Sequence, residues 1–430
     1  MLSAVANIFR IPELKKKVLI TIAILCLYRF GAYVPVPGVP FNDLLRVVEE
    51  QSSGAGALAV LNLFSGGALS RMSVFALGIM PYITSQIILQ MFQAVIPSLG
   101  ELAKEGEAGQ RKITQYTRYL TIAIATVNAI GYLFMFTAGT TGSAIDFSSV
   151  GLPTVVMDII VVGTMVTGAI IIMWLGEVIT QYGIGNGMSL IIFCNIMSGL
   201  PNALITSLTT SDTGMILTII TFVVIIAIVP LIVFIERGQR RLPVQYGKRV
   251  VGRRIMGGQA TYLPIKVNTA GVVPIIFASA ILYLPAQLAV FFPNVAWFNA
   301  VANFMISGWG NWLLEVLLIV FFAYFYTSMV FEPHETADQL RKAGGFIPGV
   351  RPGDATAQYI QNVLNHVTLP GAIFMAALAV IPSILFTFTN NELIRSFGGT
   401  SILIMVGVAM DTLSQLESQL KMHNYDGFFK

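Results

Sequence analysis

The side chains that come nearest to a metal site are Glu332, His334 and Glu335, in the stretch FEPHETAD. Their spacing matches no common ligand motif, so we interpret them as the solvated start of a helix. The stretch GIGNG at 183–187 resembles a phosphate loop, but it follows no predicted strand and lacks the lysine of that motif. The sequence therefore predicts no metal site, no nucleotide site and no cofactor.

The chain contains ten long apolar segments, described below, that we expect to lie in a membrane. Catalysis within them would need a pair of reactive side chains. The three histidines, His334, His366 and His423, lie outside those segments, and we find no Cys–His pair or paired carboxylates within them. Cys26 and Cys194 fall in apolar runs, where cysteine is typically a small buried side chain. We therefore expect a protein that is not an enzyme.

A few ionisable residues do fall within apolar segments, most clearly Arg29 and Asp411. Charges inside a membrane mark ion or proton pathways by default. A coupled transporter would place some such charges in the core of its fold. In this chain, the positions related by the internal repeat described below hold Ile, Ser and Gly. The pattern favours an apolar constriction, which closes a pore by dewetting, over a charged site. The rival hypothesis is a secondary transporter with inverted repeats, which predicts saturable uptake of a small solute.

Apolar helices must position these residues, because 55% of the 430 residues are hydrophobic and only 11% are charged. A soluble domain carries about a quarter charged residues, so we expect lipid around this chain. Ten apolar segments are long enough for helices, which satisfy their own backbone hydrogen bonds in lipid. They lie near 18–33, 73–96, 113–136, 155–176, 188–205, 215–235, 270–292, 312–331, 369–388 and 400–420.

The loops between these segments predict their orientation. With the N-terminus in the cytoplasm, the loops after even-numbered segments carry most of the Lys and Arg, in agreement with the positive-inside rule. Both termini are then cytoplasmic. Two cytoplasmic loops are long, 236–269 and 332–368. The first predicts a β-hairpin around Gly257 and Gly258, and the second predicts short helices separated by FIPGVRPGD.

Two short patterns recur between the first half of the chain, 1–205, and the second half, 206–430. The pattern G-x-x-P-x-I occurs at 78–83 and 271–276, and G-x-S-x-x-I occurs at 187–192 and 399–404. An odd number of helices in each half makes the halves inverted in the membrane. Inverted repeats place their shared site near the midplane, often at broken helices, for which these Gly and Pro residues are candidates.

Longer motifs resemble the SecY family. They are LFSGGALSRMSVFALGIMPYITSQIILQ, EGEAGQRK, GIGNGMSLIIF, GRRIMGGQATYLPIKVNTAGVVPIIFAS, FYTSMVFEPHETADQLRKAGGFIPGVRPG and GGTSILIMVGVAMD. The resemblance covers nearly the whole chain and implies an all-α polytopic membrane protein, with ten helices in two inverted five-helix halves around an hourglass pore, like a clamshell. It also implies a channel subunit that passes unfolded secretory polypeptides across the bacterial inner membrane and releases membrane-protein segments sideways into it.

The same resemblance assigns residues to parts of the channel. The pore ring, an apolar waist, is Ile83, Ile87, Met188, Ile192, Ile276 and Ile404. Met188 stands where an isoleucine is common in the family, and methionine is flexible. The plug is about 58–72, with Leu63, Phe64, Gly66, Gly67 and Leu69. The lateral gate lies between the second and seventh helices, with polar side chains that we expect to hydrogen-bond across it. Its residues are Thr84, Gln86, Asn268 and Pro274.

The partners implied by the resemblance are the small membrane subunits SecE and SecG, the SecA motor ATPase, the ribosome, signal peptides, nascent chains and the lipid bilayer. Arg253, Arg254 and Arg351 are the expected docking residues. Contacts of arginines with ribosomal RNA phosphates depend on salt. The alternative interpretation of the basic hairpin is a topology signal without a docking role.

Overall fold

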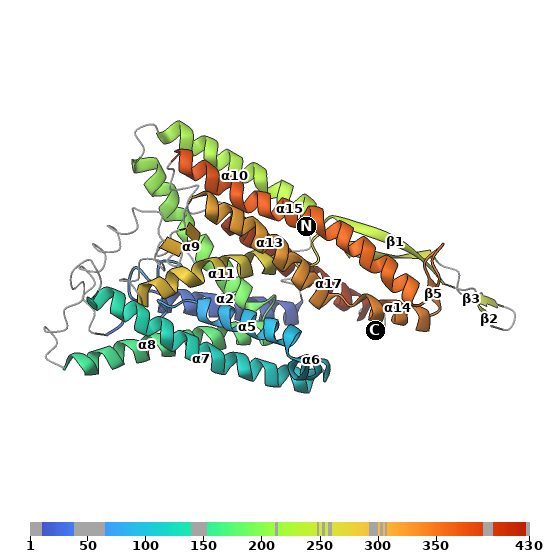
Figure 1. Ribbon diagram of the computed structural model, residues 1–430, viewed down its shortest axis with the longest axis horizontal. Coiled ribbons are helices and arrows are strands. Elements are labelled where there is room, and N and C mark those ends of the chain that lie inside the picture. The colour runs from blue at the N-terminus through green and yellow to red at the C-terminus, as the bar shows by residue number, and fades with distance from the viewer. Residues whose placement is uncertain are drawn as a thin grey trace.

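Each of the ten predicted segments coincides with a helix in the computed structural model (Figure 1). The structure describes residues 11–37, 65–138, 153–210, 214–246, 249–251, 254–256, 260–291, 300–301, 304–305, 308–389 and 399–426. In the first half the helices are α2 (Pro12–Gly31), α5 (Met80–Val95), α7 (Glu107–Ala138), α8 (Thr154–Tyr182) and α9 (Gly187–Thr210). In the second half they are α10 (Gly214–Glu236), α11 (Val273–Phe291), α13 (Trp309–Val330), α15 (Asp354–Thr389) and α17 (Thr400–Asp426).

Several of these helices suit a membrane by length and composition. Within the described residues, five stretches are long and apolar enough to cross a bilayer: 154–182, 187–205, 219–236, 309–342 and 354–385. The other predicted spans are helices that are shorter or less apolar over the part described. The helix α9 continues to Thr210, past the division that the sequence placed after residue 205.

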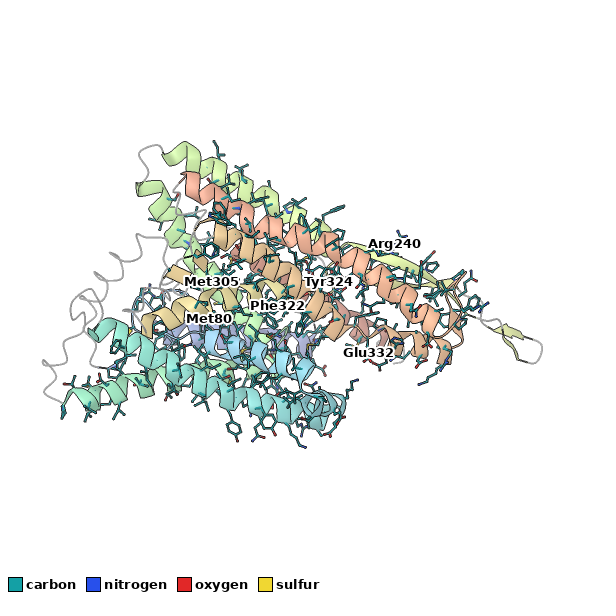
Figure 2. All side chains as sticks on the ribbon, in the orientation of Figure 1. Met80, Arg240, Met305, Phe322, Tyr324 and Glu332 are labelled. Atoms are coloured by element: carbon teal, nitrogen blue, oxygen red, sulfur yellow. The ribbon has the colours of Figure 1, made fainter. Side chains whose placement is uncertain are left out.

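The two sides of the helical body are formed by different helices. In Figure 1, α7 and α8 line one side, α10 and α15 line the opposite side, and α5 and α11 lie between them. The helix α11 contacts both α5 and α17, and α17 contacts α9. Helices from both halves therefore meet along the middle of the molecule. Figure 2 shows Met80 and Phe322 in this middle region, whereas Arg240 and Glu332 mark the end that carries the strands.

The predicted β-hairpin stands at one end of the helical body. Strands β1 (Gln239–Tyr246) and β4 (Ala260–Lys266) are antiparallel, with Gln239 opposite Lys266, and β5 (Gly345–Phe346) pairs with the other edge of β1. Farther out, β2 (Arg249–Val251) pairs with β3 (Arg254–Met256) in antiparallel orientation. Gly257 and Gly258, around which the sequence predicts the hairpin, lie outside the described residues.

The second long loop differs from its prediction in one respect. The short helix α14 (Pro333–Lys342) begins directly after Glu332, which confirms that FEPHETAD forms the start of a helix. The helix after FIPGVRPGD, however, is not short, because α15 runs without interruption from Asp354 into the ninth span. Its first turns pack on the sheet, where Leu242 and Val244 share an apolar cluster with Ile360. The remaining short helix, α6 (Pro97–Lys104), precedes α7.

The chain between α2 and α5 is irregular yet buried. Residues 65–79 form a series of turns, and Ala68, Met72 and Ile79 are almost fully buried. Backbone of this kind is tolerated at membrane depth only where protein or water covers it. Helix α8 covers part of this segment, and Gly168 lets it pack closely, because a Cβ at this position would overlap the backbone carbonyl of Val74.

We predict that Gly168→Ala lowers the stability of the purified protein by about 1–3 kcal/mol, the usual cost of overpacking. Gly163→Ala is a matched control on the same helix, since a Cβ there has no atom within 4 Å. The control should be neutral or slightly stabilising, because alanine favours helix more than glycine does. Thermal unfolding in detergent measures both variants, and equal midpoints would contradict the close approach of α8 to this segment.

Candidate functional site

The six predicted ring residues are all buried in one apolar cluster. Each is at most 8% exposed, and all six belong to one continuous apolar cluster in the middle of the molecule. They come from four helices and from both halves of the chain: Ile83 and Ile87 from α5, Met188 and Ile192 from α9, Ile276 from α11, and Ile404 from α17. None of the six residues is charged. Their use as a pore constriction stays a prediction.

The first repeat is visible in the backbone. Gly78 and Gly271 have nearly the same left-handed φ angles, 58° and 63°, and each lies two positions before the first residue of its helix. In both copies the residue after the glycine accepts the N–H of the ring isoleucine four positions later. The two acceptors are Ile79 and Val272, and the two ring residues are Ile83 and Ile276. These Gly and Pro residues therefore start α5 and α11, and the sequence interpretation of them as breaks within a helix was wrong.

The second repeat positions α9 and α17 by close backbone contacts. A Cβ on Gly187 would overlap the carbonyl of Gly176 on α8, and a Cβ on Gly399 would overlap the carbonyl of Ala379 on α15. Of the two, Gly399 has a left-handed φ, 57°. Both glycines stand at the start of a helix that carries ring residues, so each fixes how near that helix lies to its neighbour.

The tip of the Met188 side chain packs against α8. The sulfur and terminal methyl of Met188 occupy the space beside Gly176, where any larger residue on α8 would meet them. The side chain therefore packs toward α8 at its end, and it is 8% exposed. An isoleucine is too short to reach as far, so the unusual methionine is matched by the glycine facing it.

The structure describes three of the five named plug residues. Gly66 and Gly67 have φ angles of 65° and 81°, and Leu69 is 3% exposed. Leu63 and Phe64, like all of 58–64, lie outside the described residues. Farther along, Val36 N–H donates to Met72 O and Val74 N–H donates to Val34 O, both at 2.9 Å, so residues 72–74 are paired with the chain after α2.

Of the four gate residues, Thr84 and Asn268 have side-chain hydrogen bonds that do not join α5 to α11. Thr84 Oγ1 donates to Met80 O within α5 at 3.0 Å. Asn268 precedes α11, and its Nδ2 donates to Glu236 Oε2 of α10 and to Gly271 O, each at 3.0 Å. The expectation that these two donors bond across the gate was therefore wrong. Gln86 is half-buried on α5, and Pro274 is buried in the first turn of α11.

Two of the three predicted docking arginines, Arg254 and Arg351, lie in described segments at the strand-bearing end of the molecule. Arg254 begins β3, and Arg351 is exposed three residues before α15. Arg253 lies outside the described residues. The exposed Arg351 and the short β2–β3 ribbon thus belong to the two segments that extend from the helical body, as Figure 1 shows for the strands.

Sequence reasoning missed two polar residues in this region. Asn195 lies within the predicted fifth span and is fully buried, where its Oδ1 accepts a hydrogen bond of 2.9 Å from Tyr28 OH of α2. The signal for Asn195 was present, since an amide inside an apolar segment needs a polar partner. Glu236, which ends α10 and receives the Asn268 bond, was read only as the edge of a loop.

Comparison with known proteins agrees with this arrangement. A sequence model of the SecY family matches residues 73–413. The chain is 43% identical over 448 residues to a protein translocase subunit SecY of Streptomyces coelicolor and 44% identical over 443 residues to that of Mycobacterium tuberculosis, with 100% of both chains covered in each case. A solved structure of a protein-conducting channel has a TM-score of 0.61 at 18% identity, with 96% of both chains covered. A second, from a study of the SecY plug domain, gives the same values.

Proposed function

This chain belongs to the SecY family and forms a protein-conducting channel, and on that premise we propose that polypeptides pass through the ring of Ile83, Ile87, Met188, Ile192, Ile276 and Ile404. The protein is a multi-pass membrane protein with the ten-helix clamshell fold of its family. The observation that supports the assignment of the pore is the meeting of these six aliphatic side chains, from both halves, in one buried cluster. An apolar ring closes around a passing chain and excludes water and ions.

The proposed route to the lipid lies between α5 and α11. These helices contact each other, and each begins at a glycine of the same repeat. When a partner and an apolar signal segment separate the two helices, a segment of about 20 apolar residues moves sideways because lipid solvates it better than the pore does. The plug covers the ring on the other side until the gate opens.

The proposed location is the bacterial inner membrane, with both termini in the cytoplasm. The distribution of Lys and Arg supports this orientation. In the structure, Lys17 Nζ of α2 donates to Gln419 Oε1 of α17 at 3.4 Å, so the beginning of the first helix and the end of the last lie at the same end of the body. An even number of membrane spans also places the two termini on the same side of the membrane. Exposed α14 and the strands lie at that end as well.

We propose that the cytoplasmic loops bind SecA and the ribosome, and that SecE and SecG accompany the channel in the membrane.

We predict that replacing Arg253, Arg254 and Arg351 by glutamine weakens ribosome binding and lowers the slope of log affinity against log salt by about 2–3, since each lost phosphate contact lowers it by about 0.7–0.9. Cosedimentation with ribosomes over a salt series measures this. Arg341→Gln is the control, because Arg341 is exposed on α14 and pairs with Asp338 at 3.2 Å. An unchanged slope for the triple variant would leave the arginines as topology signals alone.

The decisive test of the pore places a photocrosslinker at Ile87 or Ile276 and stalls a secretory chain during transport. We expect adducts with the stalled chain at both positions. The controls are Ile373 on α15, 55% exposed, and Phe234 on α10, 78% exposed, which face away from the cluster. Adducts at the outer positions in place of the ring positions, or saturable uptake of small solutes by the purified protein, would favour the transporter hypothesis instead.

A further inference from the structure

Arg29, the clearest charge within the first span, contacts the plug. It lies in the last turn of α2, and its Nη1 donates a hydrogen bond of 2.9 Å to the carbonyl oxygen of Gly66. Because the donor carries a full charge, this bond is stronger than one between neutral groups. The default reading of a membrane charge as part of an ion path therefore does not describe Arg29, which is directed at the backbone of a neighbouring segment.

Gly66 fits a site that has no room for a side chain. Its φ of 65° is left-handed, and a Cβ there would lie 2.7 Å from Asn195 Oδ1 and 2.8 Å from Arg29 Nη1. Asn195 Oδ1 also accepts the hydrogen bond from Tyr28 OH, and the Tyr28 ring stacks on Phe75 with centroids 5.6 Å apart. The site thus joins α2, α9 and the plug around the backbone of one residue.

The wall formed by α9 connects this site to the ring. Asn195 follows Ile192 by one helical turn, so the two side chains lie on neighbouring positions of the same face. Any shift of α9 relative to α2 that widens the ring also changes the distance between Asn195 and the Arg29 side chain. The fit around Gly66 depends on both, so it depends on the position of α9 relative to α2.

The two ends of the described plug are held differently. Residues 72–74 pair through backbone hydrogen bonds with residues 34–36. Gly66 is held by the Arg29 side chain and by its fit against Asn195. Between them, Gly67 has a φ of 81° and open space around its Cβ position. The end at residues 72–74 is thus held by backbone pairing, whereas the contacts of Gly66 with Arg29 and Asn195 involve side chains.

We propose that Arg29 is the positioning residue that holds the Gly66 end of the plug against α9 in the closed channel. Loss of the Arg29 bond, or a shift of α9 against α2, breaks the fit, and the plug then turns about residues 72–74, out of the pore. This inference rests on the proposed function of the segment as a plug. A competing interpretation gives Arg29 only a local role, as a positive charge at the C-terminus of a helix and over the Tyr33 ring, 5.4 Å from its centroid.

The test is the resting ion conductance of purified channels in planar bilayers. We expect Arg29→Gln to raise it on the order of tenfold, because a hydrogen bond to a charged group has about that effect on an equilibrium. Arg29→Lys retains the helix-end charge but loses the planar fork of donors, so it should also leak. Gly66→Ala should leak as well, and combining it with Arg29→Gln should add little, since both changes break one contact. Arg118→Gln is the control, because Arg118 bonds Glu177 between α7 and α8.

A deletion of residues 60–67 separates failure of this inference from failure of the proposed plug. The inference is supported if the deletion raises conductance and Arg29→Gln has no further effect in that background. It is overturned if the deletion opens the channel but Arg29→Gln leaves the intact channel closed. It is also overturned if Arg29→Gln raises conductance equally in the intact and deleted channels, or if the Arg29→Lys channel stays closed. A deletion that leaves conductance unchanged would remove the plug role itself, and the proposed role of Arg29 with it.

Discussion

Replacing Ile83, Ile276 and Ile404 together by glycine is expected to raise the resting ion conductance of the purified channel at least about tenfold. These three residues come from α5, α11 and α17, and each is at most 7% exposed in the central cluster. Their loss leaves space that water can fill, and an apolar constriction that is wetted no longer excludes ions. A decrease of only about 1.4 kcal/mol in the barrier gives a tenfold change. Single-channel recording in planar bilayers measures it.

Loss of stability alone must be separated from loss of the seal. Each buried isoleucine that is truncated costs about 2–5 kcal/mol wherever it lies in a core. Glycine substitutions at Ile172 and Ile179 of α8 and at Ile319 of α13 provide a matched control, because these residues are at most 1% exposed in the same cluster but are not ring residues. The control should unfold at lower temperature and stay closed to ions. Equal leaks in both triple variants, or none in the first, would refute the assignment of the ring.

The second large effect is expected at Gly399, whose replacement by alanine should destabilise the protein by about 2–5 kcal/mol. The left-handed backbone costs about 1–2 kcal/mol for a residue with a Cβ. Overlap of that Cβ with the carbonyl of Ala379 adds about 1–3 kcal/mol, since the obstacle is backbone and cannot rotate away. Because α17 carries Ile404 five residues later, the shifted helix should also raise the resting conductance.

Gly349→Ala provides the comparison for that experiment. Gly349 has a φ of 84°, also left-handed, but no atom lies within 4 Å of its Cβ position. It should therefore show the backbone cost alone and leave conductance unchanged, as measured by thermal unfolding and bilayer recording. If the two alanine variants lose equal stability, the close contact of α17 with α15 does not contribute.

The helices were predictable because a membrane imposes a simple rule on sequence. Segments such as 155–176 and 215–235 are apolar over a full span, so both the existence and the type of element follow from composition. The start of α5 was not predictable in the same way. The apolar segment 73–96 includes seven residues of buried turns, because Gly78 takes a left-handed conformation that apolarity does not reveal.

The site was predictable where a pattern repeats and less so where partners come from distant parts of the chain. The patterns from Gly78 and Gly271 already pointed to Ile83 and Ile276, and the structure brings those two together. The partners of Asn268 were predicted wrongly, because an amide near the start of α11 has several donors and acceptors within reach. Only tertiary structure selects Glu236 among them.

The buried turns of residues 65–79 limit where the plug can go. A helix can leave through an opening toward lipid because its own backbone satisfies every N–H and C=O, whereas irregular backbone loses its partners there. For the proposed plug this leaves only the aqueous path along the axis of the pore. The proposed opening between α5 and α11 can then release a helix into the lipid while the irregular segment is retained in the channel.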